Sequence, residues 1–309
     1  MNKKVSVIGA GNVGATCAQR IAQRSCADVV LLDIIEGMPQ GKALDMMHSH
    51  PIVGSNISIT GTNSYRDTAG STVVVITSGS PRKPGMSRDD LVAVNSAVMK
   101  SVVPQVLGYS PDCVIIVVTN PLDAMAYLTL KISGLPKNRV MGMSGVLDTG
   151  RFRSIVAAEI GVSVEDVSAC ILGAHGDTMV IIPRLTKIGP VPLTDLLPQK
   201  RIDELIDRST SSGAEIVGLL KTGSAFYAPG MAAAQMAEAI VLDASRVLPV
   251  CAYLDGEFGL SDIYMGVPAK IGAAGVEKVL EFELTPDEQV ALAKSAQSVR
   301  NLIDMLDLS

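Results

Sequence analysis

Three residues between positions 148 and 175 could together move a proton beside a bound anion. His175 lies in LGAHGD, where small neighbours leave room for a ligand against its imidazole, and histidine is the natural proton acceptor near neutral pH. Asp148 and Arg151, in LDTGR, are three positions apart and would share one helix face. An aspartate could orient an imidazole, and the planar fork of an arginine could hold a carboxylate. A structural histidine and a surface ion pair are the ordinary alternatives.

A cationic loop offers a second candidate site. SGSPRKPGMSR, residues 78–88, contains Arg82, Lys83 and Arg88 among prolines and glycines that exclude a regular helix or strand. The loop follows the aliphatic run TVVVIT, and loops that follow buried strands often carry function. Because the chain has a net charge of -5, this basic stretch is a local feature that could await an anion. The alternative is an exposed basic loop with no ligand.

A glycine motif indicates a dinucleotide. Gly9-Ala10-Gly11-Asn12-Val13-Gly14 matches G-x-G-x-x-G between a strand and a helix, where the glycines permit a tight turn and close approach of a pyrophosphate to the helix N-terminus. Asp33 ends the next strand, 19 residues after Gly14. A carboxylate there accepts hydrogen bonds from the ribose hydroxyls and repels a 2′-phosphate, which favours NAD over NADP. A glycine turn that binds no nucleotide is the alternative.

Two further segments hold polar residues at element ends. Asn120, in VVTNPLD, ends a strand and could border a ligand crevice or cap the helix expected from about Pro121. His48 and His50, in MMHSHP, could ligate a metal, but no carboxylate or cysteine cluster accompanies them. We therefore interpret the two histidines as a solvated helix end and predict no metal site.

The elements that must position these residues alternate along the first half. Short aliphatic, β-branched runs are typical of parallel strands covered on both faces; they are VSVIG (5–9), DVVLLD (28–33), ISITGT (57–62), TVVVIT (72–77), CVIIVV (113–118) and RVMGM (139–143). Segments with helical spacing separate them, at NVGATCAQRIAQR, GMPQGKALDMMHS and DDLVAVNSAVMKSVVPQVL. This alternation predicts a doubly wound, parallel α/β sheet over residues 1–144.

The rhythm changes after about residue 144. Helical stretches such as LDTGRFRSIVAAEI and DELIDRSTSSGAEIVGLLKTG flank β-rich pieces such as DVSACILGAHG and RVLPVCAYL. We predict an α+β second domain over residues 145–309 that shares an extensive interface with the first, since no Ser/Gly linker separates them.

Composition excludes several classes of protein. With 48% hydrophobic and 18% charged residues in 309, the chain can bury a large core. No Lys/Arg cluster dominates, which argues against a nucleic-acid partner, and the longest apolar runs are too short to span a bilayer. The five cysteines are scattered without a C-x-x-C pair, which indicates reduced thiols in a cytoplasmic protein.

Taken together, the motifs GAGNVG, TSGSPRKPGMSR, VVTNPLD, GVLDTGRFR and GAHGD, with Asp33, resemble the lactate/malate dehydrogenase family over essentially the whole chain. PRKPGMSR is similar to the malate-specific members. Ser78 departs from the family pattern, in which alanine is often present, and should affect only packing. The resemblance implies a Rossmann domain, NAD as cofactor, a dicarboxylate substrate and a homotetramer, with a dimer as the alternative.

The resemblance also implies residue roles. His175 would be the catalytic proton acceptor and Asp148 its partner. Substrate would be bound by Arg82, Arg88, Asn120 and Arg151. Cofactor contacts would come from Ile8, Gly9, Ala10, Gly11, Asn12, Val13, Gly14, Asp33, Asn95, Val118, Thr119 and Asn120. The implied reaction is reversible oxidation of (S)-malate to oxaloacetate. Lactate or another 2-hydroxyacid is the second possibility, and a catalytically silent nucleotide-binding protein is the third.

Overall fold

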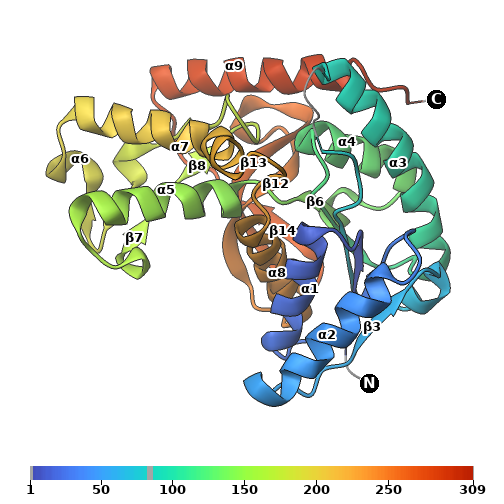
Figure 1. The fold of residues 1–309 in the computed structure, drawn as a ribbon. Coiled ribbons are helices and arrows are strands. Elements are labelled where there is room, and N and C mark those ends of the chain that lie inside the picture. Colours follow the sequence, from blue (N-terminus) through green and yellow to red (C-terminus); the bar gives the residue numbers. More distant parts are fainter. Residues whose placement is uncertain (1–2, 82–85, 309) are drawn as a thin grey trace.

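A nine-stranded mixed sheet forms the centre of the computed structural model, which describes residues 3–81 and 86–308 (Figure 1). Its strand order is β14-β13-β12-β6-β5-β4-β1-β2-β3. The strands from the first half run parallel; they are β1 (Lys4–Ile8), β2 (Asp28–Leu32), β3 (Ile59–Thr62), β4 (Val73–Ile76), β5 (Val114–Val117) and β6 (Val140–Gly142). Each begins and ends within two residues of its predicted run.

Three strands from the second half extend this sheet beyond β6. They are β12 (Arg246–Asp255), β13 (Ser261–Gly272) and β14 (Gly275–Val279), and they pair antiparallel. Cys251 of β12 pairs with Gly142 of β6 at the junction. The sequence pattern does not predict this continuation, because the strands of both halves are similarly aliphatic and their composition does not determine which strands pair.

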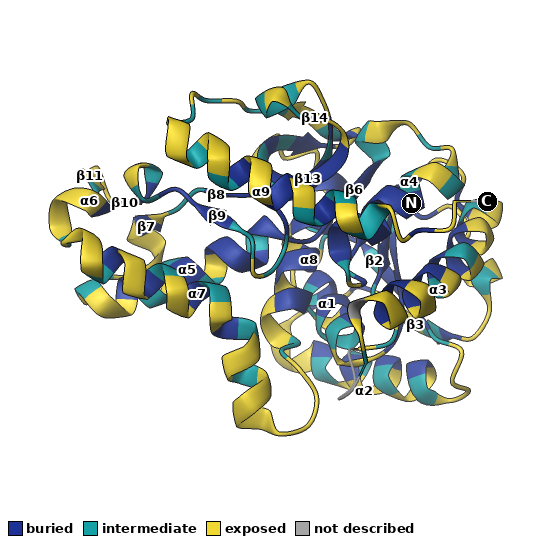
Figure 2. Ribbon diagram, turned by 90° about the horizontal axis from the view of Figure 1, so that it is seen from above, coloured by how far each residue is buried: buried dark blue, intermediate teal, exposed yellow. Residues whose placement is uncertain are grey.

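Helices cover both faces of the sheet, and the central strands β4 and β5 are buried along their whole length (Figure 2). One face packs against α1 (Asn12–Gln23) and α8 (Tyr227–Val241), which also contact each other; α2 (Met38–Val53) packs beside β3. The other face packs against α3 (Arg88–Tyr109) and α4 (Leu122–Ser133). Helix α9 (Pro286–Ile303) packs against α4 and β13, and its buried residues belong to the same hydrophobic cluster as those of α1 and α8. This arrangement confirms the predicted doubly wound α/β fold.

Helix α3 is long and apolar enough over Asp89–Tyr109 to cross a membrane by length and composition alone. Val92, Met99 and Val103 on this helix are nevertheless fully buried in the protein core against the sheet. We therefore interpret α3 as a core helix.

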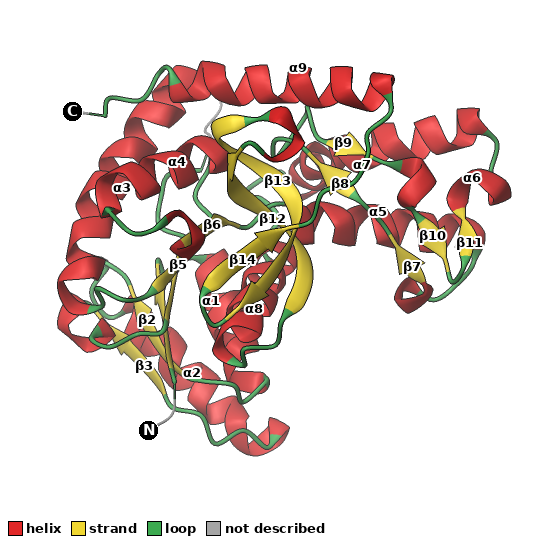
Figure 3. Cartoon of the chain, turned by 180° about the vertical axis from the view of Figure 1, so that it is seen from behind, coloured by secondary structure: helices red, strands yellow, loops and turns green. Residues whose placement is uncertain are grey.

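A smaller lobe holds the rest of the second half. It contains α5 (Gly145–Ile160), α6 (Leu193–Leu196), α7 (Gln199–Leu220) and the short strands β7 (Val167–Ser168), β8 (Ile171–Leu172), β9 (Val180–Ile181), β10 (Lys187–Ile188) and β11 (Val191–Pro192). Phe152, Leu193 and Ile202 belong to its own hydrophobic cluster. Strands β7, β10 and β11 lie well away from the main sheet (Figure 3). Short 3-10 helices occur at Tyr65–Thr68, Lys137–Arg139, Val164–Asp166, Pro183–Leu185 and Glu257–Gly259.

The interpretation of His48 and His50 as a solvated helix end is correct for His48 and wrong for His50. Helix α2 continues through Pro51 to Val53, so both residues lie inside it. His48 is exposed, but His50 is buried and its Nδ1 has no hydrogen-bond partner. Pro51 stands three residues before the Gly54 C-cap, so the N–H that it lacks removes one intrahelical hydrogen bond only at the end of the helix.

Candidate active site

The glycine loop lies where the chain order of the sheet reverses, since β1 pairs with both β2 and β4. Gly9 has a φ of 107°, which favours glycine, and a Cβ on Gly14 would lie 1.8 Å from the carbonyl oxygen of Gly9. Gly11 starts α1 without a side-chain cap, and the first turn of α1 contains no acidic residue. The free N–H groups of this turn can therefore receive a diphosphate.

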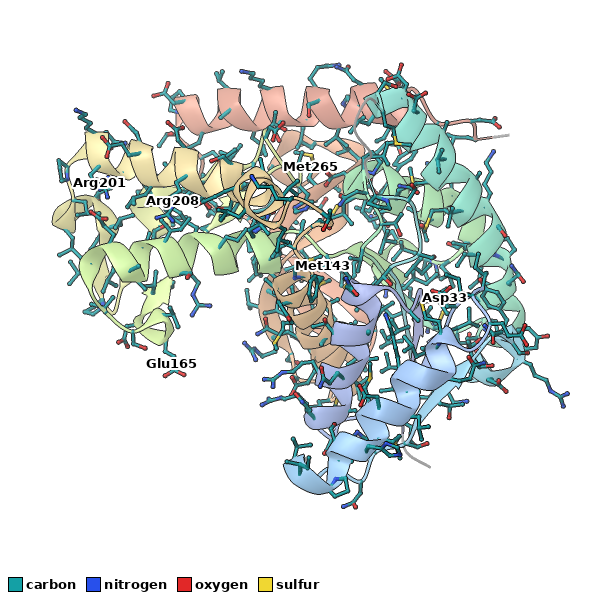
Figure 4. The ribbon with its side chains drawn as sticks, in the orientation of Figure 1. Asp33, Met143, Glu165, Arg201, Arg208 and Met265 are labelled. Carbon is teal, nitrogen blue, oxygen red and sulfur yellow. The ribbon has the colours of Figure 1, made fainter. Side chains whose placement is uncertain are left out.

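Asp33 is tied to the same loop. Its Oδ2 accepts a hydrogen bond from the backbone N–H of Ala10 at 2.7 Å, and its Oδ1 accepts one from Ile35 at 3.0 Å. Asp33 follows β2 and lies at the same edge of the sheet as the start of α1 (Figure 4). The open loop, the uncapped helix and the carboxylate together fit the diphosphate and ribose of a dinucleotide such as NAD.

The remaining residues predicted for this loop lie around it. Ile8 ends β1 and is buried, whereas Asn12 and Val13 are the first two residues of α1 and are exposed and half-buried, respectively. The side-chain ammonium of Lys42 donates to the carbonyl oxygen of Ala10 at 2.7 Å. Lys42, which no sequence motif indicates, thus places a cation beside the expected diphosphate.

A hydrogen-bonded strap joins the ends of β4 and β5. Asn95 of α3 is fully buried; its amide donates to the carbonyl oxygens of Ser80 (3.1 Å) and Asn120 (2.6 Å), and its Oδ1 accepts from the Ser80 N–H at 2.7 Å. Thr119 Oγ1 donates to the carbonyl oxygen of Ser78 at 2.6 Å. The structure thus brings Asn95, Val118, Thr119 and Asn120 together, but it shows the Asn95 side chain occupied by backbone contacts. The side chain of Asn120 is exposed and is available to a ligand.

The predicted proton-transfer residues meet at the base of the smaller lobe. His175 Nδ1 lies 2.9 Å from Asp148 Oδ2, and the two side chains are 15% and 3% exposed. Arg151, one helical turn along α5, has its guanidinium 3.7 Å from Asp148 Oδ1. The Arg151 Nε is buried without a hydrogen-bond partner. Such a donor is what an incoming carboxylate would satisfy.

Burial and neighbouring charges have opposite effects on the pKa values of His175 and Arg151. Burial lowers the pKa of His175, but the charge of Asp148, the hydrogen bond to it and the charge of Asp123 together raise that pKa above its usual value. Burial also lowers the pKa of the Arg151 guanidinium, and Asp148 opposes this effect. Because Nδ1 of His175 faces Asp148, Nε2 is the nitrogen left to exchange a proton with a ligand.

A cavity of about 560 Å³ opens beside Arg151, between α5, α7 and α8. Its lining is mostly apolar, and the charged residues in it are Arg151 of α5 and Arg208 and Glu215 of α7. Figure 4 shows Arg208 on α7, above α5. Arg151 lines this cavity, but His175 and Asp148 do not, so the cavity adjoins the histidine–aspartate pair.

The predicted loop arginines are only partly covered by the structure. Arg82 lies outside the described residues. Arg88 is the first residue of α3, which begins with a capping box formed by Ser87 and Asp90, but its side chain lies outside the described part of the chain. Their proposed roles therefore rest on the sequence.

Sequence reasoning missed two residues that hold the His175 loop. Asp123 of α4 accepts a hydrogen bond from the His175 N–H at 3.1 Å, and Ser295 of α9 accepts one from the Ala174 N–H at 2.8 Å. Asp123 stands within the motif VVTNPLD, three residues after Asn120. The motif alone, however, does not predict that Asp123 binds the backbone of a residue 52 positions away.

This combination of a dinucleotide loop with a histidine–aspartate pair and an adjacent arginine matches a known class. The family model described as the lactate/malate dehydrogenase NAD binding domain matches residues 3–142, and the alpha/beta C-terminal domain of the same family matches residues 145–306. The chain belongs to the lactate/malate dehydrogenase family and is therefore an NAD-dependent oxidoreductase. The predicted family and cofactor are confirmed.

Individual relatives are similar over their whole length. A malate dehydrogenase of Desulforudis audaxviator is 55% identical over 306 residues, which is 99% of each chain. Among solved structures, malate dehydrogenase from Salinibacter ruber is 52% identical with a TM-score of 0.94, covering 98% of this chain and 97% of that one. A lactate dehydrogenase from Cryptosporidium parvum, complexed with lactic acid and NAD, is 43% identical with a TM-score of 0.96, covering 100% and 99%.

Proposed function

We propose that this protein catalyses the reversible, NAD-dependent oxidation of (S)-malate to oxaloacetate. The observation that carries the chemistry is the 2.9 Å contact between His175 and Asp148 beside the cationic Arg151. The choice of malate is supported by the loop PRKPGMSR and by full-length relatives named malate dehydrogenase at 53–56% identity.

Arg151 would hold the C1 carboxylate of the substrate. Its guanidinium is largely buried on α5, and its unpartnered Nε can join a terminal nitrogen in two parallel hydrogen bonds. Gly213 of α7 lies against this guanidinium, since a Cβ there would come 3.8 Å from it. The missing side chain at Gly213 keeps space beside the arginine for an anion.

His175 would take the hydroxyl proton of malate through its Nε2. Asp148 fixes the ring by its contact with Nδ1 and stabilises the imidazolium that results. Bound NAD would accept the hydride from C2 of the substrate. In the reverse direction, protonated His175 would polarise the carbonyl oxygen of oxaloacetate and return its proton.

The cationic loop would complete the site. We assign Arg82 to the distal carboxylate, Arg88 to the reacting C2 oxygen and Asn120 to both substrate and cofactor. Closure of such a loop would exclude water and strengthen each charged contact. In the open cofactor crevice, we assign contacts to residues 8–14, to Asp33, and to residues 118–120. Asn95 would hold the Ser80 and Asn120 backbones in place for these contacts.

Arg82 distinguishes malate from lactate chemistry. With pyruvate in the closed site, Arg82 would have no anion to pair with, which is unfavourable; with oxaloacetate it would gain a charge-assisted hydrogen bond of about 1.5–3 kcal/mol. Arg82→Gln should therefore lower kcat/KM for oxaloacetate roughly 10- to 150-fold and raise it for pyruvate. Arg88→Gln should lower both values, because the C2 carbonyl is shared.

The test compares kcat/KM of these two variants on both substrates, with Lys83→Gln as a control for loop charge. An equal loss on both substrates in Arg82→Gln would refute the assignment of malate. A wild type that binds NADH but turns over no 2-oxo acid would support the catalytically silent alternative.

We propose further that residues 1–144 form the NAD-binding domain and residues 145–309 the substrate domain of a cytoplasmic homotetramer, with a dimer as the alternative. Large apolar side chains on α2 and α7 support self-association, since Ile52 is 85% and Leu219 is 75% exposed. Light scattering against the 32.3 kDa chain mass distinguishes the two assemblies. The net charge of -5 supports a small-molecule rather than a nucleic-acid partner.

A further inference from the structure

Two consecutive backbone amides of the His175 loop are held by side chains from two different helices. The Ala174 N–H donates to Ser295 Oγ of α9 at 2.8 Å, and the His175 N–H donates to Asp123 Oδ2 of α4 at 3.1 Å. The other oxygen of Asp123 accepts from the thiol of Cys251 on β12, with a sulfur-to-oxygen distance of 3.1 Å. The loop is thereby fixed from both sides.

Ser295 and Asp123 differ in charge, although each accepts a hydrogen bond from a backbone N–H of the loop. Ser295 holds its amide with a neutral hydroxyl, so holding the loop does not require a carboxylate. Asp123 is only 3% exposed, and burying an ionised carboxylate is unfavourable unless its charge is compensated. Both of its oxygens accept hydrogen bonds, as expected for an ionised carboxylate, which has no donor of its own.

Burial raises the pKa of Asp123, whereas the hydrogen bond from Cys251, the charge of His175 and the hydrogen bond from the His175 N–H all lower it. Among the described groups, His175 is thus the one whose positive charge favours the ionised form of Asp123. Among the described side chains, the charged groups that act on His175 are Asp148 and Arg151 of α5 and Asp123 of α4. Burial lowers the pKa of His175, Asp148 raises it most, Asp123 raises it further and Arg151 lowers it. The Cys251 thiol faces Asp123, and burial raises the pKa of that thiol far enough to keep it neutral.

We propose that Asp123 is a second positioning carboxylate for His175, which anchors its main chain and whose negative charge favours the imidazolium form. This inference rests on the proposed function only in giving His175 a catalytic role. Asp148 contacts the imidazole ring at Nδ1, whereas Asp123 accepts a hydrogen bond from the backbone N–H of His175. The charges of two carboxylates then favour the protonated ring, and the charge of Arg151 disfavours it.

Histidine-selective NMR can test the proposal without turnover, because the chain contains only three histidines. Protein labelled with ¹³C at histidine Cε1 gives three signals, and His175→Asn identifies the one that belongs to His175. In Asp123→Asn, which keeps an oxygen acceptor for the amide, the pKa of His175 should fall. It should fall further in Asp148→Asn. The signals of His48 and His50 serve as internal references.

Ser295→Ala is the matched control, because it removes the neighbouring loop hydrogen bond without changing charge. The His175 titration should stay at its wild-type midpoint in this variant. An unchanged midpoint in Asp123→Asn would overturn the proposal, as would a shift in Ser295→Ala as large as that in Asp123→Asn, since loop geometry alone would then be responsible.

Cys251 provides a second route if Asp123→Asn does not fold. Cys251→Ala removes the donor that stabilises the charged form of Asp123 and should lower the His175 midpoint, whereas Cys251→Ser keeps a donor and should not. Equal midpoints in these two variants would contradict the proposal. Retention of full turnover by His175→Asn would instead refute the proposed function while leaving the NMR result valid.

Discussion

Asp148→Asn should separate the charge of this carboxylate from its shape. The substitution keeps a side chain of the same size between His175 and Arg151, where Asp148 is 3% exposed. During malate oxidation His175 becomes positively charged, so its 2.9 Å contact with Asp148 changes from a neutral hydrogen bond into an ion pair. An asparagine stabilises the neutral ring nearly as well but loses the added attraction for the charged ring.

The size of the effect follows from this burial. A hydrogen bond to a charged group contributes about 1.5–3 kcal/mol, and solvent screening is small for a carboxylate this buried. At about 1.4 kcal/mol per tenfold in rate, kcat for malate oxidation should fall roughly 10- to 150-fold. KM should change much less, because Arg151 remains free to bind the substrate carboxylate.

Stopped-flow hydride transfer and steady-state kinetics measure the two quantities. Asp255→Asn is the control, since Asp255 forms an exposed ion pair with Lys137 at 2.9 Å and should affect neither. A hydride-transfer rate within about threefold of wild type in Asp148→Asn would show that the charge of Asp148 does not act on the reacting histidine.

Two further predictions concern the cofactor loop and pH. Gly14→Ala should weaken NADH binding severely, because its Cβ would lie 1.8 Å from the Gly9 carbonyl oxygen. Gly41→Ala is the control and should bind NADH normally, since a Cβ at Gly41 would have nothing within 4 Å. Fluorescence titration measures the NADH affinity of both variants, and equal affinities would contradict the packing argument. Because the pKa of His175 is raised and malate oxidation needs the neutral ring, kcat/KM for malate should rise with pH through that pKa. For oxaloacetate, which needs the protonated ring, kcat/KM should fall over the same range. Parallel pH profiles in both directions would exclude His175 as the titrating group.

The sequence predicted those parts of the fold and site that depend on local pattern. Continuous β-branched runs predicted the six parallel strands, and the glycine spacing predicted the turn before α1. The pairing of His175 with Asp148 came from the family motifs, and the structure brings the two side chains together.

The remaining features depend on contacts between distant segments. The addition of β12–β14 to the sheet follows from pairing across the chain. The anchors of the His175 loop come from residues 52 and 121 positions away. Asn95 stands in a helical pattern that does not reveal its buried contacts with Ser80 and Asn120.

The pairing of β6 with β12 means that the sheet can be completed only late in the synthesis of each molecule. Cys251 both pairs with Gly142 at that junction and donates to Asp123, which precedes it by 128 positions. On the ribosome, the glycine loop and its parallel strands emerge long before Cys251 does. The histidine loop therefore receives its Ser295 anchor only after α9 has been made, and the nascent protein has its nucleotide-binding strands before it has a finished catalytic centre.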